Sequence, residues 1–258
     1  MGLFDKLFEK KICAICGNEI KLLGNRKLED GNMCKNCATK LSPWFSERRS
    51  STVAEIQEQL AYRERNFEEV KNFRITRTIG GDNVKILLDE NARKFVVTSA
   101  RNLVSENPDV LDYAQVTGCK VNINEDREEV KRQDKDGKMV SYNPARYKCE
   151  YDFYVEIYVN HPYFNEMGFK LNSSSVQTTP ETGVPGNRMP NPRFNPEYKQ
   201  YEEMGNEIVE ILTNVRQQAR DEEIAATAPK TAVTCPWCGA TTMADDNGCC
   251  EFCGGSLK

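Results

Sequence analysis

The chain of 258 residues carries 35 Lys and Arg against 39 Asp and Glu, which gives a formal net charge of −4 at pH 7. A general nucleic-acid binder shows a basic excess, so this balance argues against nucleic acid as a partner. Eleven cysteines, an odd number with eight of them in Cys-x-x-Cys pairs, argue against a disulfide framework and indicate metal sites in a reducing compartment.

The first expected element is a short amphipathic helix at residues 2–11. Its apolar side holds Leu3, Phe4, Leu7 and Phe8, and its charged side includes Lys6, Lys10 and Lys11. A helix this short is marginal alone, so the apolar side is expected to pack on the protein or on a second copy, with a membrane surface as the alternative. The charges near Met1 do not fit a signal peptide, and no stretch approaches the roughly 20 apolar residues of a membrane span. A cytoplasmic location is therefore expected.

A four-cysteine zinc module is expected over residues 1–50. Its two Cys-x-x-Cys pairs, separated by 17 residues, are Cys13, Cys16, Cys34 and Cys37. Four thiolates at such spacing fit the tetrahedral coordination of Zn2+ in closed structural sites. Residues 20–23 and 26–28 are predicted to pair in a hairpin, and the second cysteine pair to begin a helix running through residues 38–41. The result is a treble-clef-like module whose folding free energy comes from the metal.

The residues of this module resemble a known family. Three runs carry the resemblance: Cys13-Ala14-Ile15-Cys16-Gly17, then Leu28-Glu29-Asp30-Gly31-Asn32-Met33-Cys34-Lys35-Asn36-Cys37, and Lys40-Leu41-Ser42. They are similar to the N-terminal four-cysteine module of a family of uncharacterised bacterial proteins, a domain of unknown function. In those relatives the module precedes a β-rich domain similar to bacterial pleckstrin-homology-like domains. The resemblance covers the N-terminal module alone and implies a zinc site and an architecture, without an activity.

A connecting helix is predicted over residues 51–66, with Ser50-Ser51-Thr52 as its N-terminal cap. Its apolar face holds Val53, Ile56 and Leu60. The opposite face is expected to be solvated and holds Glu55, Glu58, Arg63, Glu64 and Arg65. Just before this helix, Trp44-Phe45 is expected to be a packing anchor.

A β domain is predicted over residues 67–222, because the apolar period there changes from that of a helix to that of a strand. The expected strands are residues 73–79, 84–88, 95–98, 116–123, 128–132, 139–142, 148–159 and 169–171. The longest strand alternates six residues that are expected to face the core: Cys149, Tyr151, Phe153, Val155, Ile157 and Val159. Residues 173–195, rich in Pro and Gly, are expected to be a loop that is disordered or binds a partner.

A helix from Pro196 to about residue 221, capped by Asn195, is predicted to end this domain. Strands followed by one long amphipathic helix match the element order of a pleckstrin-homology-like domain. Together with the resemblance, this order predicts the α+β class. The expected fold is a pleckstrin-homology-like β-barrel or sandwich with a C-terminal helix, flanked by two small four-cysteine zinc domains.

Residues 223–234 are expected to link the β domain to a second zinc module, a zinc ribbon over residues 235–258. Its ligands are expected in two Cys-x-x-Cys-Gly runs separated by 11 residues, at Cys235, Cys238, Cys250 and Cys253. The glycine after each pair permits the positive φ that turns the backbone toward the metal. Cys249 is an alternative ligand, but the Cys-x-x-Cys-Gly run favours Cys250.

The sequence offers few groups for catalysis. His161 is the one histidine of the chain, so neither a histidine-based triad nor a catalytic zinc held by histidines can form. No Gly-x-x-x-x-Gly-Lys-Ser/Thr phosphate loop is present. Carboxylate catalysis and thiol–disulfide exchange stay open as alternatives, although the cysteine spacing favours metal over exchange. No enzymatic activity is expected.

The leading hypothesis is a non-enzymatic zinc-binding adaptor that holds two Zn2+ and recruits a protein partner. One alternative is a nucleic-acid-associated factor in which Trp237 and Phe252 of the zinc ribbon stack on bases. Acidic residues of the same ribbon argue against it because they would repel phosphate: Asp245, Asp246 and Glu251. The other alternative is a membrane-surface adaptor acting through residues 2–11.

Overall fold

The computed structural model describes residues 11–21, 23–81, 83–179, 190–227, 232–245 and 247–257. The chain divides into two compact units, Met1–Arg216 and Gln217–Lys258, and the division falls within the last helix. Three expectations concern residues outside the described part: nearly all of the amphipathic helix at residues 2–11, the middle of the loop at residues 173–195, and part of the linker at residues 223–234.

The N-terminal module is built from two short hairpins and one helical turn. Strand β1 (Lys11–Ile12) pairs with β2 (Glu19–Ile20), β3 (Asn25–Lys27) pairs with β4 (Asn32–Cys34), and α1 (Lys35–Ala38) follows. The predicted hairpin between residues 20–23 and 26–28 is wrong. The chain turns back at Gly17, so Ile20 pairs with Lys11. A second turn brings β3 against β4, and the Leu28 N–H closes this turn by donating to the Gly31 carbonyl.

Helix α2 (Val53–Asn72) is longer than expected and follows the 3-10 turn η2 (Glu47–Ser50). Thr52 caps it as predicted, and a reciprocal bond from the Thr52 N–H to the Glu55 carboxylate completes a capping box. The helix continues beyond residue 66 because Val70 and the residue after its end, Phe73, are also buried. Arg63, expected on the solvated face, is buried instead.

The first sheet is a meander of four antiparallel strands. Its strands are β5 (Arg77–Gly80), β6 (Lys85–Asp89), β7 (Lys94–Thr98) and β8 (Val110–Asp112), with α3 (Leu103–Glu106) between the last two. Strand β8 was not predicted, because three residues are too few to show alternation. A 3-10 turn, η3 (Tyr113–Gln115), then interrupts the chain before the second sheet.

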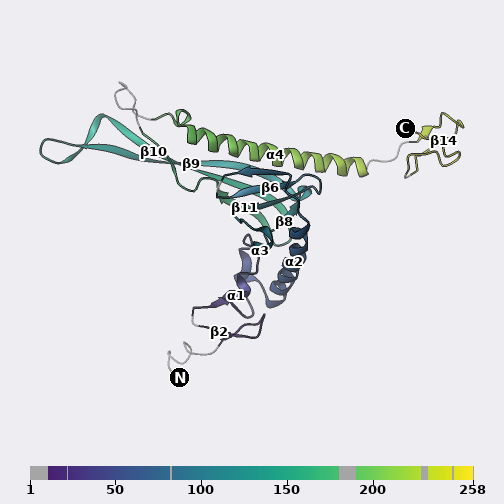
Figure 1. The fold of residues 1–258 in the computed structure, drawn as a ribbon, viewed down its shortest axis with the longest axis horizontal. Helices are drawn as coiled ribbons and strands as arrows, with labels where there is room; N and C mark the ends of the chain where they lie inside the picture. Colours follow the sequence, from purple (N-terminus) through teal and green to yellow (C-terminus); the bar gives the residue numbers. More distant parts are fainter. Residues whose placement is uncertain are drawn as a thin grey trace. The chain divides into compact units, whose positions relative to one another are not determined.

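The second sheet is dominated by two long strands. Strand β9 (Val116–Gln133) pairs with β10 (Met139–His161), and the opposite edge of β10 carries β11 (Phe164–Lys170) and β12 (Val176–Thr178). The sequence had divided β9 and β10 into four strands. In the structure they are continuous, with an irregular register between Ser141 and Arg146, and they run out past the other strands as a two-stranded ribbon (Figure 1).

The main core lies on one face of these sheets, under helix α4 (Pro196–Thr227). The six alternating residues of β10 from Cys149 to Val159 are all buried, as predicted. Asn195 caps α4 as expected, because its Oδ1 accepts hydrogen bonds from the Glu197 and Tyr198 N–H groups. The helix comes close to β9 at Gly205, where a Cβ would lie 3.0 Å from a methyl group of Val121. The turn η4 (Pro192–Phe194) precedes this helix.

The two sheets do not close into a barrel. Across the described residues, no strand of the first sheet pairs with a strand of the second. The barrel form of the predicted fold is therefore wrong, because the turn η3 separates the ladder of β8 from that of β9. The structure confirms the coarser prediction of a mixed α and β chain, mostly sheet, with a C-terminal helix and a four-cysteine group near each end.

Trp44 and Phe45 link the N-terminal module to its surroundings, as predicted for a packing anchor. Trp44 packs against the main core, whereas Phe45 packs against a second cluster formed by the N-terminal module and Ile56 of α2. In the second unit, the C-terminal four-cysteine segment contains β13 (Val233–Thr234), which pairs with β14 (Thr241–Thr242). No helix in the described ranges has the length and apolar character needed to cross a membrane.

Candidate metal centres

The N-terminal module brings the sulfur atoms of Cys13, Cys16, Cys34 and Cys37 within 4.8 Å of one another. Cys13 and Cys16 lie on the turn after β1, where the Cys13 N–H donates to the Asn18 carbonyl and the Gly17 N–H donates to the Cys13 carbonyl. Cys34 is the N-terminal cap of α1, and its sulfur accepts a hydrogen bond from the Cys37 N–H. One pair therefore comes from a turn and the other from a helix N-terminus.

The sulfur separations in this group fit a tetrahedral metal ion. Zn–S bonds of about 2.3 Å place the four sulfurs of a tetrahedron about 3.8 Å apart. The Sγ atoms of Cys16 and Cys34 are 3.8 Å apart, far longer than the roughly 2.0 Å of a disulfide. The group can therefore hold a metal ion through four sulfurs.

The thiols of this group differ in acidity. Burial acts to raise the pKa of Cys13, but the backbone N–H groups of Cys16, Cys34 and Ile15 outweigh it and lower the pKa to about 6. Burial and hydrogen bonds with the other thiols raise the pKa of Cys37. Four thiols this close cannot all ionise unless a cation balances their charge, and a divalent metal supplies that charge.

The C-terminal ribbon brings together Cys235, Cys238, Cys250 and Cys253, again with all sulfurs within 4.8 Å. The Sγ separations are 3.6 Å for Cys235 and Cys253 and 3.7 Å for Cys238 and Cys250. Backbone N–H groups of Cys238 and Trp237 outweigh the burial of Cys235 and lower its pKa to about 7. The Gly255 N–H acts to lower the pKa of Cys253, but hydrogen bonding with Cys238 and burial raise it to about 12.

The two cysteine turns of this ribbon have the same backbone geometry. The Cys235 N–H donates to the Ala240 carbonyl and the Cys250 N–H to the Gly255 carbonyl, both at 2.8 Å. The turn at Cys13 repeats this pattern. The ribbon thus has two identical turns facing each other, whereas the N-terminal module replaces the second turn by a helix.

Side-chain direction distinguishes Cys249 from Cys250. Cys250 is buried and belongs to the four-sulfur group. Cys249 pairs through its backbone with Ser256 and donates its N–H to the Asp245 carboxylate at 2.8 Å, and its sulfur lies near the Asn247 carbonyl. Adjacent residues of an extended segment point to opposite sides, so only one of the two can face the metal.

The glycine after each turn has a testable role. Gly254 has φ +71°, and a Cβ there would meet nothing within 4 Å. Glycine is therefore favoured at this position by its backbone conformation and not by a lack of space for a side chain. We expect Gly254→Ala to weaken metal binding about tenfold, because a left-handed residue other than Gly costs about 1–2 kcal/mol. Competition with a chromophoric chelator measures this change. Gly254→Asn serves as the control, because Asn adopts this conformation more readily, and equal weakening by both variants would contradict the explanation.

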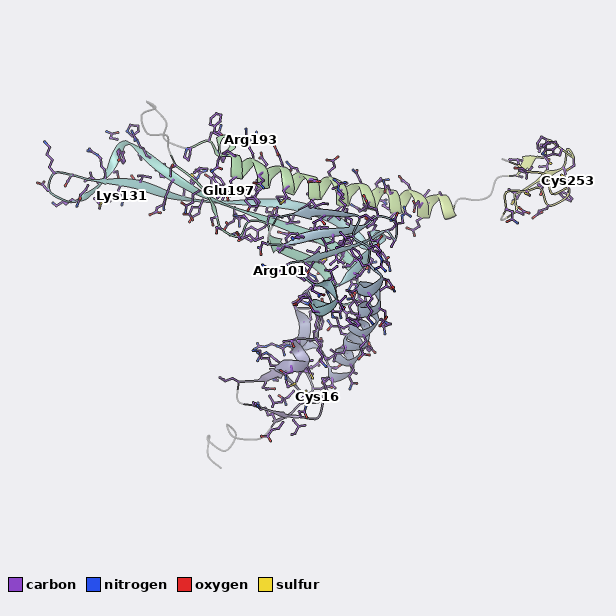
Figure 2. All side chains as sticks on the ribbon, viewed as in Figure 1. Cys16, Arg101, Lys131, Arg193, Glu197 and Cys253 are labelled. Carbon is purple, nitrogen blue, oxygen red and sulfur yellow. The ribbon has the colours of Figure 1, made fainter. Side chains whose placement is uncertain are left out.

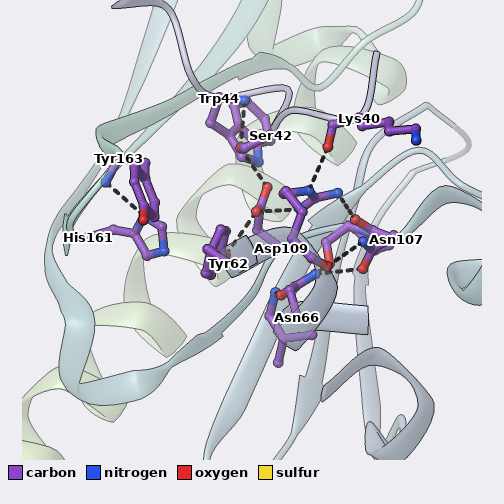
Figure 3. A network of polar contacts seen from close by, with 12 residues as sticks. Lys40, Ser42, Trp44, Tyr62, Asn66, Asn107, Asp109, His161 and Tyr163 are labelled. Carbon is purple, nitrogen blue, oxygen red and sulfur yellow. Dashed lines mark hydrogen bonds and ion pairs between the residues drawn. The ribbon is translucent and has the colours of Figure 1, made fainter. Parts of the chain in front are cut away.

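A buried polar network connects the N-terminal module to the first sheet, and the sequence did not predict it. The Asp109 carboxylate receives hydrogen bonds from Ser42, Tyr62 and Arg63 at 2.8, 2.9 and 2.6 Å, respectively (Figure 3). The side chains of Arg63 and Asp109 are 7% and 0% exposed. Arg63 also donates to the backbone carbonyls of Lys40 and Asn107. One ion pair therefore joins the N-terminal module, α2 and the segment before β8.

His161 lies close to this network but is packed among aromatic rings. Its ring stacks on Phe164 at 4.1 Å and meets Tyr62 edge-on at 4.9 Å. Burial lowers the pKa of His161, although Asp109 opposes the shift. The structure brings no cysteine sulfur group to this position, and the two four-cysteine groups remain the sites with metal-binding geometry among the described residues.

The sequence pattern of a domain of unknown function (DUF4428) matches residues 11–59. The match covers the first four-cysteine group, α1 and the beginning of α2, which confirms the resemblance of the N-terminal module to a domain of unknown function. Neither a curated protein nor a solved structure matches the chain.

Proposed function

We propose that the protein is a non-enzymatic, zinc-stabilised adaptor that recruits a protein partner. Two Zn2+ would be held by the eight cysteines of the two groups, Cys13, Cys16, Cys34 and Cys37 in the first and Cys235, Cys238, Cys250 and Cys253 in the second. Sulfur-only ligands at tetrahedral spacing favour zinc among the available metals. A complete set of four sulfurs supports a structural role, because it leaves no coordination position for a substrate.

The observation that carries the recruiting role is the pair of aromatic side chains on the C-terminal ribbon. Trp237 and Phe252 are 74% and 71% exposed. Each directly precedes the second cysteine of its turn, so a metal-held loop presents it to solvent. Exposed aromatic side chains on a rigid support are the anchors that dominate the binding energy of protein interfaces.

The same proposal extends to the fold and location. The element order of two four-stranded sheets followed by α4 supports a pleckstrin-homology-like sandwich, and free cysteines in metal-type spacing support a cytoplasmic setting. The aromatic packing of His161 supports the absence of catalysis by that residue. The membrane alternative rests on residues 2–11, of which only Lys11 is described.

An affinity capture with matched variants tests recruitment. We expect the tagged wild-type protein, treated with nuclease, to retain a defined protein that the Trp237→Ala/Phe252→Ala double variant loses. Met243→Ala is the control, because Met243 is an exposed apolar residue of the same ribbon outside the cysteine turns. Zinc content must remain equal in all three proteins. Retention of the same proteins by wild type and double variant, or loss of binding on nuclease treatment, would contradict the proposal.

A further inference from the structure

The far end of the β9–β10 ribbon is a separate surface feature, which we call the ribbon tip and define as residues 130–147. It contains five Lys and Arg against two Asp in a chain whose net charge is −4. Neither β11 nor β12 reaches it, because their pairing with β10 begins at Tyr154 and Cys149. Figure 2 places Lys131 on this outer part of the ribbon. The tip is therefore a basic two-stranded projection on which no other described strand pairs.

The cations of the tip have no carboxylate partner among the described residues. The ion pairs of the structure include none of the five: Lys131, Arg132, Lys135, Lys138 and Arg146. The Asp134 carboxylate instead accepts the backbone N–H groups of Asp136 and Lys138 and thereby holds the turn.

The base of the same ribbon is different. Arg127 donates two hydrogen bonds to Glu125, at 2.7 and 3.0 Å, and Lys148 lies 2.6 Å from Glu128. Paired cations at the base and unpaired cations at the tip share one ribbon, so exposure alone does not explain the difference.

Two of the unpaired cations are held in place by an aromatic ring. The guanidinium groups of Arg132 and Arg146 lie 5.9 and 4.6 Å from the ring centroid of Tyr142. Contact with a ring restrains a guanidinium group without using its N–H donors. Both groups therefore keep their donors available for an anionic ligand, and less conformational entropy is lost when one binds.

We propose that the ribbon tip binds an acidic, extended segment of a protein partner through Arg132 and Arg146. This inference rests on the proposed recruiting function and names the chemistry of the partner. Carboxylates of the segment receive paired N–H bonds from the guanidinium groups. Strand β9 pairs only with β10 among the described strands, so its outer edge offers backbone groups to an extended peptide.

The charges behind the tip favour a short acidic peptide over nucleic acid. Four acidic residues stand directly behind it, at Glu125, Asp126, Glu128 and Glu129. Glu125 and Glu128 are paired with Arg127 and Lys148, whereas Asp126 and Glu129 form no ion pair among the described residues. A duplex carries phosphates continuously along its length, so phosphates beyond the tip would meet the Asp126 and Glu129 carboxylates. An acidic segment confined to the tip avoids them.

Fluorescence anisotropy with a labelled Glu-rich peptide and the whole 258-residue chain, purified in the presence of zinc, tests the proposal. We expect Arg132→Gln/Arg146→Gln to weaken peptide binding about a hundredfold, since each of the two lost charged hydrogen-bonding groups is worth about one factor of ten. The matched control is Arg127→Gln/Lys148→Gln, which removes the same amount of charge from cations that are already paired. We expect less than about a threefold change from it.

Three results would overturn the proposal: no binding of the Glu-rich peptide by the wild type, equal weakening by both double variants, or tighter binding of a duplex oligonucleotide that the Arg132→Gln/Arg146→Gln variant abolishes. Thermal unfolding of all variants establishes that the fold is intact. If the affinity capture fails while the Glu-rich peptide still binds, the recruiting role of Trp237 and Phe252 is refuted and the proposal that the ribbon tip binds an acidic segment is retained. If the capture succeeds but the peptide does not bind, only the proposal about the ribbon tip is refuted.

Discussion

Replacing Cys250 by Ser is expected to lower the zinc content of the purified protein from two equivalents per chain to about one, and to unfold the C-terminal ribbon. The described part of this ribbon buries very few side chains, chiefly Cys235, Thr242 and Cys250, so it has almost no apolar core of its own. Its folding free energy must then come from metal coordination, which supplies on the order of 10 kcal/mol in structural zinc peptides. Elemental analysis and amide NMR spectra of the ribbon measure the two effects.

Cys249→Ser provides the control for this variant. Its sulfur lies outside the four-sulfur group, so we expect two equivalents of zinc and an unchanged spectrum. The reverse result, with zinc lost from the Cys249 variant and kept by the Cys250 variant, would move the ligand to Cys249. One equivalent or none in the wild type, purified without chelator, would refute the two-zinc proposal.

Replacing Asp109 by Asn is expected to destabilise the first unit by about 3–5 kcal/mol, because it leaves the Arg63 guanidinium buried without a counter-charge. The loss should loosen the attachment of the N-terminal module, since Ser42 also binds this carboxylate. Urea unfolding followed by circular dichroism measures the change. Zinc content should stay at two equivalents, because no ligand is altered.

Two further variants test the cause. Arg77→Gln breaks the half-exposed ion pair with Glu207, and we expect it to cost less than about 1 kcal/mol. Adding Arg63→Met to Asp109→Asn removes the uncompensated charge and should recover part of the lost stability. A loss under about 1 kcal/mol for Asp109→Asn, or no recovery in the double variant, would show that the ion pair does not hold the module in place.

Much of the candidate metal sites could be predicted because their ligands are local in sequence. A Cys-x-x-Cys-Gly run determines its own turn through the positive φ of its glycine and the hydrogen bonds around its first cysteine. The pairing of one run with the other then follows from the need for four sulfurs. The hairpins between the ligands were not predictable in the same way, because β1 pairs with β2 across the first turn and weak two-residue strands carry no alternation.

Alternation also determined the core face of β10, since every second residue from Cys149 to Val159 is apolar or aromatic and every one is buried. The continuity of β9 and β10 was not evident, because the polar run at residues 124–127 and the Asn143-Pro144 pair interrupt the alternation between the predicted strands. Strand pairing alone holds these residues in register.

The sequence by itself determined the grouping of eight cysteines into two sets of four, the caps of α2 and α4, and the buried face of β10, because each depends on residues close in the chain. Only the tertiary structure decided the burial of Arg63, the separation of the two sheets and the extension of the ribbon tip beyond β11 and β12. Arg63 and Asp109 are 46 residues apart, and a charged residue on a helix reads as solvated until its partner is known. The physical reason is that local backbone preferences act within a few residues, whereas burial and ion pairing depend on which distant segments meet.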